Sequence, residues 1–155
     1  FSIDYRNFKT ARTNEYAIII LKEYFPKKRI LDFELKKNDR EPYLGILHLD
    51  CTFNPIGKDK CIIYKNGFVD ESDYHLILDI FGEENCFHVT DEEMFEMYPN
   101  IFSISPEIVV SDQAFTRMNN HLRNEWGMTV EEIPYREISK MGGLLRCSTL
   151  PLVRA

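Results

Sequence analysis

The hydrophobic pattern contains three segments in which apolar residues recur three and four positions apart, the spacing of one helix face. Each segment opens with residues that cap helices and ends at a proline or glycine: Asn14 and Pro26, Ser72-Asp73 and Gly82, Ser111-Asp112 and Gly127. The pattern predicts three amphipathic helices, over residues 14–25, 72–82 and 111–127.

Short apolar runs between and after these helices are typical of β-strands. We expect strands at residues 30–33, 44–52, 86–89, 101–104, 130–133 and 144–149, with two further strands at 60–64 and 107–110. Polar linkers are expected at 36–42, 91–97 and 134–141, and the second of these can hold a helical turn.

The order helix, strand, linker and strand occurs three times along the chain. A strand-and-helix unit repeated at intervals of a few tens of residues indicates a repeat architecture, because one unit alone cannot bury its apolar face. We therefore expect an α/β fold of about three repeats. A plain α/β sandwich with coincidental periodicity is the alternative.

Composition and charge are those of one ordinary globular domain. The 155 residues are 44% hydrophobic and 28% charged, with a net charge of -6. The longest basic run is Lys27, Lys28 and Arg29, which argues against nucleic-acid and anionic membrane surfaces and favours a small-molecule partner. No apolar run approaches the roughly 20 residues of a membrane helix and no leader-like segment opens the chain, so we expect a cytoplasmic protein.

The four cysteines, Cys51, Cys61, Cys86 and Cys147, show no Cys-x-x-Cys pairing. Neither a disulfide framework nor a zinc site is favoured, and we expect reduced thiols with no cofactor. Cys61 and Cys86 are interpreted as small buried hydrophobic residues.

Candidate catalytic residues occur in two of the predicted strands. Strand alternation places His48 and Asp50 on one face, with Cys51 on the other. Cys147 follows the flexible pair Gly142-Gly143 and lies in the corresponding strand of the last repeat. A cysteine and a histidine that meet supply a nucleophilic thiolate and a proton carrier near neutral pH.

Two other interpretations apply to such residues. A lone histidine in a strand is more often structural, which is our interpretation of His75, His88 and His121. A metal site formed by His48, Asp50 and Cys51 is the other alternative, but strand alternation directs Cys51 away from the pair.

Three motifs carry a resemblance to a known superfamily. Residues His48–Asn54 resemble the His-x-Asp-x-Thr-Phe-Asn segment of glycine amidinotransferases and the His-Leu-Asp segment of arginine deiminases. Residues Gly142–Leu152 resemble the Gly-rich, Arg-Cys-Met-Thr-x-Pro-Leu end of arginine deiminases. Residues Thr10–Asn14 resemble the Ser-x-Arg-Thr-Asn stretch of dimethylarginine dimethylaminohydrolases. The three motifs follow one another in the order that they have in the guanidino-group-modifying enzymes, or penteins. The chain therefore resembles this superfamily.

The resemblance implies the pentein fold, a five-bladed α/β propeller of ββαβ units around a substrate channel. It also implies that Cys147 attacks the guanidinium carbon, that His48 protonates the departing amine and activates the incoming nucleophile, and that Asp50 binds guanidinium nitrogens. Arg12 matches an arginine that contacts the substrate carboxylate, and Arg146 is expected among the substrate-binding residues.

The reaction implied is attack on a guanidino or ureido carbon of arginine or a related compound through a covalent thiouronium. Hydrolysis would release a ureido product such as citrulline, as in deiminases and dihydrolases. The alternative is an amidinotransferase that passes the amidino group to an amine. A non-enzymatic pentein binding protein is a second alternative, which the presence of Cys147 and His48 disfavours.

The length of the chain sets a further expectation. A five-unit ring of this superfamily needs far more than 155 residues, and its N-terminal units carry additional acidic residues that hold the guanidinium. We therefore expect residues 1–155 to form the C-terminal portion of one catalytic domain, about three units, which the N-terminal half of the same enzyme completes. A homo-oligomer is left open.

Overall fold

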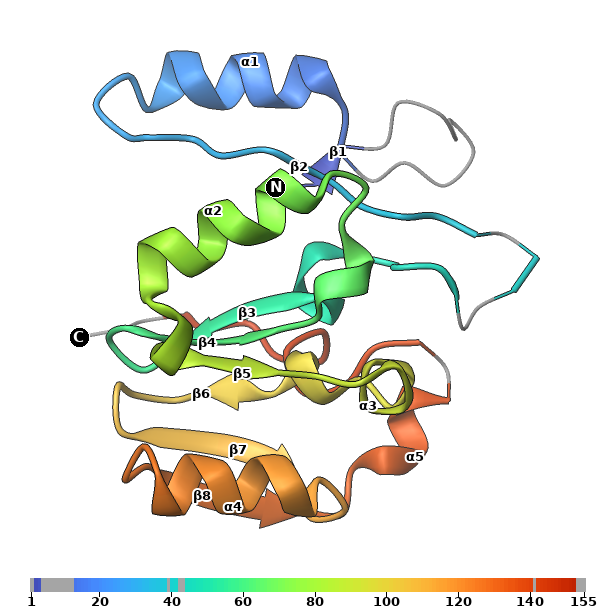
Figure 1. Cartoon of the computed structure of the whole chain (residues 1–155), viewed down its shortest axis with the longest axis vertical. Helices are drawn as coiled ribbons and strands as arrows, with labels where there is room; N and C mark the ends of the chain where they lie inside the picture. Colours follow the sequence, from blue (N-terminus) through green and yellow to red (C-terminus); the bar gives the residue numbers. More distant parts are fainter. Residues whose placement is uncertain (1, 4–12, 39, 42–43, 141, 153–155) are drawn as a thin grey trace.

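Three small β-sheets, each accompanied by a helix, form the fold (Figure 1). The computed structural model describes residues 2–3, 13–38, 40–41, 44–140 and 142–152. The sheets consist of β1 (Ser2–Ile3) and β2 (Phe33–Glu34); β3 (Phe53–Ile56), β4 (Lys60–Ile63) and β5 (Cys86–His88); and β6 (Phe102–Ser103), β7 (Ile108–Asp112) and β8 (Thr129–Ile133). The α-helices are α1 (Glu15–Tyr24), α2 (Glu71–Phe81), α3 (Asp91–Phe95), α4 (Thr116–Asn124) and α5 (Arg136–Ser139). Short 3-10 helices are η2 (Leu49–Cys51), η3 (Lys65–Gly67), η4 (Glu83–Asn85) and η5 (Tyr98–Asn100).

The two three-stranded sheets share one topology. In each, the first two strands are antiparallel and the second and third are parallel. The parallel pairs are connected by α2 in one sheet and by α4 in the other. Two consecutive units therefore have the same ββαβ order, and the mixed α/β class expected from the sequence is confirmed.

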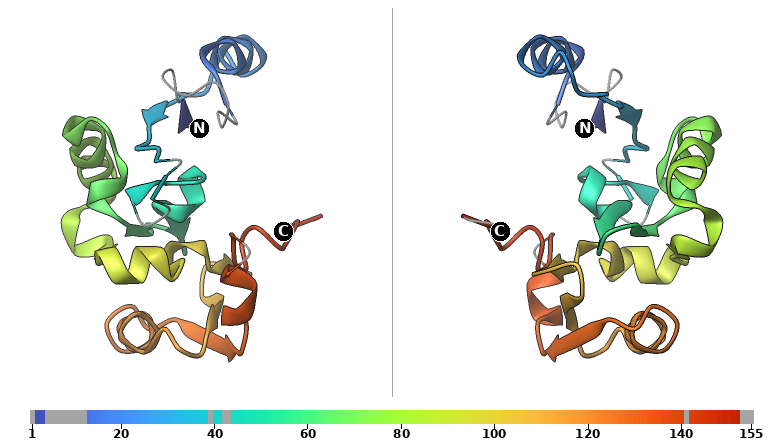
Figure 2. Two further views of the ribbon diagram at one scale, coloured as in Figure 1. Left: turned by 90° about the vertical axis from the view of Figure 1, so that its right-hand side faces the viewer. Right: turned by 90° about the vertical axis from the view of Figure 1, so that its left-hand side faces the viewer.

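The units follow one another along an open arc, with α1, α2 and α4 along its outer side (Figure 2). The first unit contains the parallel pair β1 and β2, joined through α1. Within the described residues the sheets do not close into a ring.

Side-chain caps fix the N-terminal ends of two predicted helices, α1 and α2. At α1 the Asn14 side chain accepts a hydrogen bond from the Ala17 N–H at 3.0 Å. At α2 the cap is Asp70 rather than the predicted Ser72, because the Asp70 carboxylate accepts from the Ser72 N–H at 2.8 Å. Gly82, with φ of 81°, ends α2 as expected.

The third predicted helix begins later than expected. Asp112, predicted as part of its cap, belongs to β7, and its carboxylate accepts from the N–H groups of Ala114 and Tyr135. The helix α4 begins only at Thr116, after the fully buried Phe115. Asp112 therefore does not cap the helix; its hydrogen bond to Tyr135 connects β7 to the residues that follow β8.

The predicted strand at 44–52 is wrong. The backbone of this segment bonds to the preceding loop instead of to a neighbouring strand: the Ile46 N–H donates to Lys36 O at 2.8 Å, and Lys37 Nζ donates to the carbonyls of Ile46 and Leu47. The chain then turns into η2, where the Cys51 N–H donates to His48 O at 3.1 Å.

The predicted strand at 144–149 is also wrong, because this segment forms a turn. The Ser148 hydroxyl donates to Leu144 O at 2.6 Å, and the Thr149 hydroxyl donates to Leu145 O at 2.9 Å. Serine and threonine side chains that satisfy nearby carbonyls in this way compete with sheet formation.

The strands β1 and β3 were not expected from the sequence. The segment β3 contains Pro55, which has no backbone N–H and is unfavourable inside a sheet. The strand is tolerated because, among the described residues, β3 lies at the edge of its sheet with β4 as its one partner.

The core lies between the sheets and the helices that cover them. Its residues with no exposed surface include Cys61, Ile62 and Ile63 of β4, Val109 of β7, Phe115, and Met118 and Leu122 of α4. Cys86 is also buried, so the interpretation of Cys61 and Cys86 as buried hydrophobic residues is confirmed. None of the described helices has both the length and the apolar character needed to cross a membrane.

Candidate active site

The 3-10 helix η2 sets the positions of His48 and Asp50. His48 stands immediately before η2 in extended conformation, with φ of -140° and ψ of 167°, and Asp50 lies inside it. A 3-10 turn, not strand alternation, therefore brings the two side chains to the same place. Both residues are partly buried.

Cys147 lies in the turn near the C-terminal end, and its side chain is exposed. Gly143 precedes this turn with φ of 107°, a conformation that other residues rarely adopt. A Cβ atom on Gly143 would lie 2.9 Å from Cys147 Cβ and 3.2 Å from its Sγ. Glycine at this position is thus needed both for the backbone conformation and for the placement of the cysteine.

The structure brings His48, Asp50 and Cys147 together. One nitrogen of His48, one oxygen of Asp50 and Cys147 Sγ all lie within 4.8 Å of one another. The Cys147 thiol contacts Asp50 Oδ2 at 3.7 Å. Strand geometry would space His48 and Asp50 by roughly 6 to 7 Å along the chain, so the cluster is more compact than the sequence predicted.

A fourth residue of the cluster was missed by the sequence analysis. Asn100, the last residue of η5, is fully buried, and its amide contacts both Cys147 and the backbone of Asp50. A weak signal for it exists in the sequence, since an amide side chain stands directly before the apolar run that begins at Ile101. Its partners, however, lie about fifty positions away on either side.

The surroundings of Cys147 favour its neutral form over the thiolate. Partial desolvation of the sulfur, and then the negative charge of Asp50, raise the pKa of the Cys147 thiol, whereas hydrogen bonds from Asn100 and the Leu144 backbone act in the opposite direction. Burial, and then the charge of Asp50, raise the pKa of the neighbouring Cys51 to about 12, which disfavours its thiolate. A cation placed beside Asp50 would favour the Cys147 thiolate.

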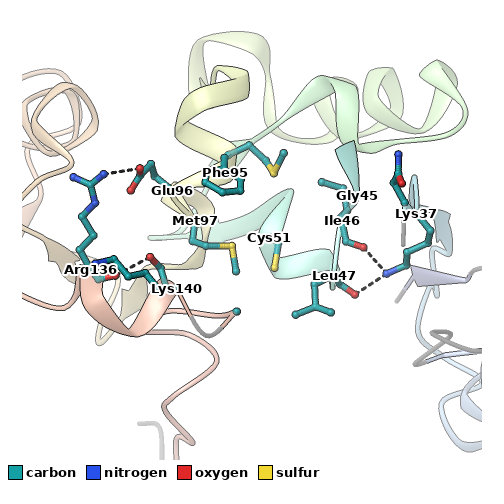
Figure 3. A pocket seen from close by; sticks show the side chains of 14 residues that line it. Lys37, Gly45, Ile46, Leu47, Cys51, Phe95, Glu96, Met97, Arg136 and Lys140 are labelled. Atoms are coloured by element: carbon teal, nitrogen blue, oxygen red, sulfur yellow. Dashed lines mark hydrogen bonds and ion pairs between the residues drawn. The ribbon is translucent and has the colours of Figure 1, made fainter. Parts of the chain in front are cut away.

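A cavity of about 740 Å³ is lined in part by sequence neighbours of the cluster residues. Figure 3 shows its lining side chains. The cavity lies between residues 37–38 and 45–47, the C-terminal end of α3 and the segment around α5. None of His48, Asp50 and Cys147 lines it, but the adjacent residues Leu47, Cys51 and Gly142 do. Its charged side chains include Arg136, which pairs with Glu96 at 2.5 Å, and Lys140, which pairs with Glu137 at 2.6 Å.

His48, Asp50 and Cys147 are also of the residue types that bind metal ions, and they form the one such group found among the described residues. Cys51, which the sequence analysis considered as a third ligand, does not belong to this group. The cysteine of this group is exposed, contacts a carboxylate and accepts a hydrogen bond from a buried amide, an arrangement that is also compatible with nucleophilic chemistry.

Arg12 and Arg146 were predicted to bind substrate, and of the two only Arg146 lies in the described residues; Arg12 lies outside them. Arg146 joins the cluster through its backbone N–H, which donates to Asn100 O at 3.0 Å. A role for either side chain in substrate binding stays a prediction.

Comparison with known proteins places the chain among guanidino-modifying proteins. The family model described as N,N dimethylarginine dimethylhydrolase, eukaryotic, matches residues 9–154. The uncharacterized protein YkgA of Bacillus subtilis (strain 168) is 30% identical over 144 residues, which are 92% of this chain and 46% of YkgA.

The fold is shared with solved structures of guanidino-modifying enzymes. The N-terminal domain of ArgZ, an arginine dihydrolase from the ornithine-ammonia cycle in cyanobacteria, matches with a TM-score of 0.76 and 20% identity over 92% of this chain and 48% of that domain. This ArgZ domain has also been solved covalently bound to a reaction intermediate. SxtG, an amidinotransferase of Microseira wollei from the saxitoxin biosynthetic pathway, matches with a TM-score of 0.69 and 20% identity over 92% of this chain and 40% of SxtG.

The chain spans about half the length of YkgA and of the ArgZ domain. The match to the family model nevertheless covers nearly all of the chain, including the segments that carry His48, Asp50 and Cys147. The three motifs, the ββαβ topology and this match agree. The chain belongs to the N,N dimethylarginine dimethylhydrolase family and, with it, to the pentein superfamily.

Proposed function

We propose that the protein acts on the guanidino carbon of arginine or a related compound, with Cys147 as the nucleophile. The observation that carries the proposal is the convergence of His48, Asp50 and Cys147, whose reactive atoms lie within 4.8 Å of one another. Membership of the dimethylarginine family and the fold shared with an arginine dihydrolase and an amidinotransferase support a guanidino substrate.

Asp50 is proposed to bind the guanidinium group. A carboxylate can accept two parallel hydrogen bonds from this planar cation. Because Asp50 Oδ2 lies 3.7 Å from Cys147 Sγ, a guanidinium held there presents its carbon to the sulfur. The bound cation would also lower the pKa of Cys147, which burial and Asp50 raise, so that substrate binding activates the nucleophile.

His48 is proposed to move the protons. Cys147 passes its proton to His48, and the resulting thiolate forms a C–S bond to the guanidino carbon; the C–N bond breaks as His48 gives that proton to the departing amine. The product of this step is a thiouronium on Cys147. His48 then takes one proton from a water molecule that attacks the same carbon, and as the C–S bond breaks the remaining hydroxyl proton passes to the sulfur, which releases a ureido product and restores the Cys147 thiol.

Water is the proposed acceptor. The family name describes a hydrolase, which supports release of a ureido product such as citrulline. SxtG is an amidinotransferase with the same fold, so the fold alone does not separate hydrolysis from transfer. An amine in place of water would produce a new guanidino compound, which is the alternative function.

We further propose that residues 1–155 contribute about three of the five ββαβ units of a propeller, whose remaining units complete the guanidinium site. The arrangement of units along an open arc supports this assembly (Figure 2). The cavity of about 740 Å³ beside the cluster would hold the rest of the substrate. Arg12 and Arg146 are candidates for binding its carboxylate.

The test is turnover of arginine, agmatine and methylarginines by the complete protein, with separate detection of ureido and guanidino products. Cys147→Ser should abolish turnover and leave the fold intact. Cys51→Ser, a matched change in the buried neighbouring cysteine, should retain activity. Activity that survives in Cys147→Ser would contradict the proposal, and a guanidino product formed only when an amine is added would favour transfer.

A further inference from the structure

Asn100 links the nucleophile to the carboxylate through a buried amide. Its side chain has no exposed surface. Asn100 Oδ1 accepts hydrogen bonds from the backbone N–H groups of Leu144 at 2.8 Å and Cys147 at 3.2 Å. Asn100 Nδ2 donates to Cys147 Sγ at 3.2 Å and to the backbone carbonyl of Asp50 at 3.3 Å. One side chain thereby contacts both segments that carry the reactive groups.

The chemistry of the partners fixes the orientation of this amide. Both partners of Asn100 Oδ1 are N–H groups, which can only donate, so the oxygen must face them. The nitrogen then has two hydrogens, and one carbonyl and one sulfur accept them. All four hydrogen-bonding positions of the asparagine are used.

Asn100 is itself held in place by the neighbouring sheet. The Asn54 side chain of β3, which is buried, donates to the carbonyls of Pro99 at 2.7 Å and Ile101 at 3.0 Å. These carbonyls flank Asn100 on both sides. The backbone carbonyl of Asn100 in turn accepts from the Arg146 N–H at 3.0 Å. A hydrogen-bonded path therefore runs from β3 through η5 to the turn that carries Cys147.

We propose that Asn100 is a positioning residue, which holds the Cys147 turn against Asp50 and donates a hydrogen bond that stabilises the Cys147 thiolate. The inference rests on the proposed function, in which Cys147 is the nucleophile and Asp50 binds the substrate cation. Hydrogen bonds to an ionised partner are stronger than those between neutral groups. The Asn100 bond to Sγ should accordingly strengthen when the thiol loses its proton.

The two parts of the amide can be separated by substitution. Asn100→Asp keeps an acceptor for the N–H groups of Leu144 and Cys147, but it removes the donor to Sγ and places a like charge beside the thiolate. Asn100→Ala removes both parts and adds neither charge nor bulk. Asn100→Asp therefore tests whether the amide stabilises the Cys147 thiolate. Asn100→Ala tests the contribution of the whole amide group.

The experiment measures the rate at which iodoacetamide alkylates Cys147 in the complete protein as a function of pH, with the modified residue identified by peptide mass spectrometry. Among the described residues, the titratable groups around Cys147 are His48, Asp50 and Cys51. At neutral pH, Asn100→Asp should alkylate roughly tenfold or more slowly than the wild type, and its rate should rise only at higher pH. Turnover of the guanidino substrate should fall as well.

Asn119→Asp is the matched control, because Asn119 is another buried asparagine whose amide donates to Asp112 O at 2.9 Å, away from the cluster. Its alkylation profile should equal that of the wild type. If Asn100→Asp does not fold, Asn100→Ala should also alkylate more slowly than the wild type, by a smaller factor because it adds no like charge. An unchanged profile in a folded Asn100 variant, or an equal shift in Asn119→Asp, would overturn the inference. Alkylation needs no turnover, so failure of the proposed function would show instead as activity that survives in Cys147→Ser.

Discussion

The reactivity of Cys147 depends on neighbours that act in opposite directions. Asp50 lies 3.7 Å from the sulfur and, after burial, is the main cause that raises the pKa of the thiol. Asn100 donates to the same sulfur and favours the thiolate. In the proposed reaction Asp50 is nevertheless essential, because it binds the cation that reverses this balance.

Asp50→Asn should therefore separate thiol reactivity from catalysis. Removing the negative charge favours the thiolate, so the Cys147 alkylation profile should move to lower pH and alkylation at neutral pH should become faster. Turnover should fall by about 10² or more, because a buried cation loses its counter-charge. Alkylation and steady-state turnover of the same preparation measure the two effects.

Asp91→Asn provides the control, since it changes the net charge equally but removes a carboxylate that accepts from Tyr64 Oη at 2.8 Å. It should leave both measurements of Cys147 unchanged. Slower alkylation in Asp50→Asn, or turnover that remains normal, would show that Asp50 does not have the proposed role.

Single residues could be predicted where a motif carried them. His48, Asp50 and Cys147 stand in recognisable segments, and the structure places all three in one cluster. Asn100 could not be predicted, because its four partners are two backbone N–H groups, a backbone carbonyl and a sulfur from distant segments. Contacts to backbone atoms leave no pattern in the sequence of the partners.

At the scale of elements, the 3-10 helix η3 packs directly on the segment that leads out of the cluster. A Cβ atom on Gly67 would lie 2.0 Å from Thr52 Oγ1 and 2.8 Å from Thr52 Cβ. Thr52 is fully buried, and its hydroxyl donates to Tyr64 O at 2.9 Å. Thr52 therefore cannot move aside without breaking a buried hydrogen bond.

Gly67→Ala should lower the free energy of unfolding by about 1 to 3 kcal/mol, the cost of adding a methyl group to a well-packed core. Urea denaturation followed by circular dichroism measures this change. Gly127→Ala is the control, because Gly127 has φ of 64° but nothing within 4 Å of its added Cβ. Gly127→Ala should thus report backbone strain alone, about 1 kcal/mol. Equal stability of Gly67→Ala and the wild type would contradict the packing account.

Helices and strands could be predicted from the sequence where the hydrophobic pattern within one segment is enough to determine its structure. The helices α1, α2 and α4 follow from periodicity and from a terminal proline or glycine. The segments at 44–52 and 144–149 are apolar enough for strands, but their backbone groups bond to the 36–37 loop and to serine or threonine hydroxyls. The outcome depends on partners outside the segment, which periodicity does not contain.

At the scale of the whole molecule, the two ββαβ units and the β1–α1–β2 segment lie along an open arc (Figure 2). The cluster of His48, Asp50 and Cys147 forms where residues 48–50, which lead into the first complete unit, meet η5 and the turn that follows α5. Chain segments about a hundred positions apart thus supply Asp50 and Cys147. The repeat was visible in the sequence because each unit has the same order of elements, whereas the contact between distant segments arises only when the units pack together.

The most direct test of the account is mass spectrometry of the complete protein, acid-quenched while it turns over its guanidino substrate. The account predicts a covalent adduct on the peptide that contains Cys147, with the mass of the thiouronium group. In His48→Asn, both formation and decay of this adduct should be slower by about 10² to 10⁴, because the proton carrier is lost. An active protein with no adduct on Cys147, or with the adduct on Cys51, would contradict the account.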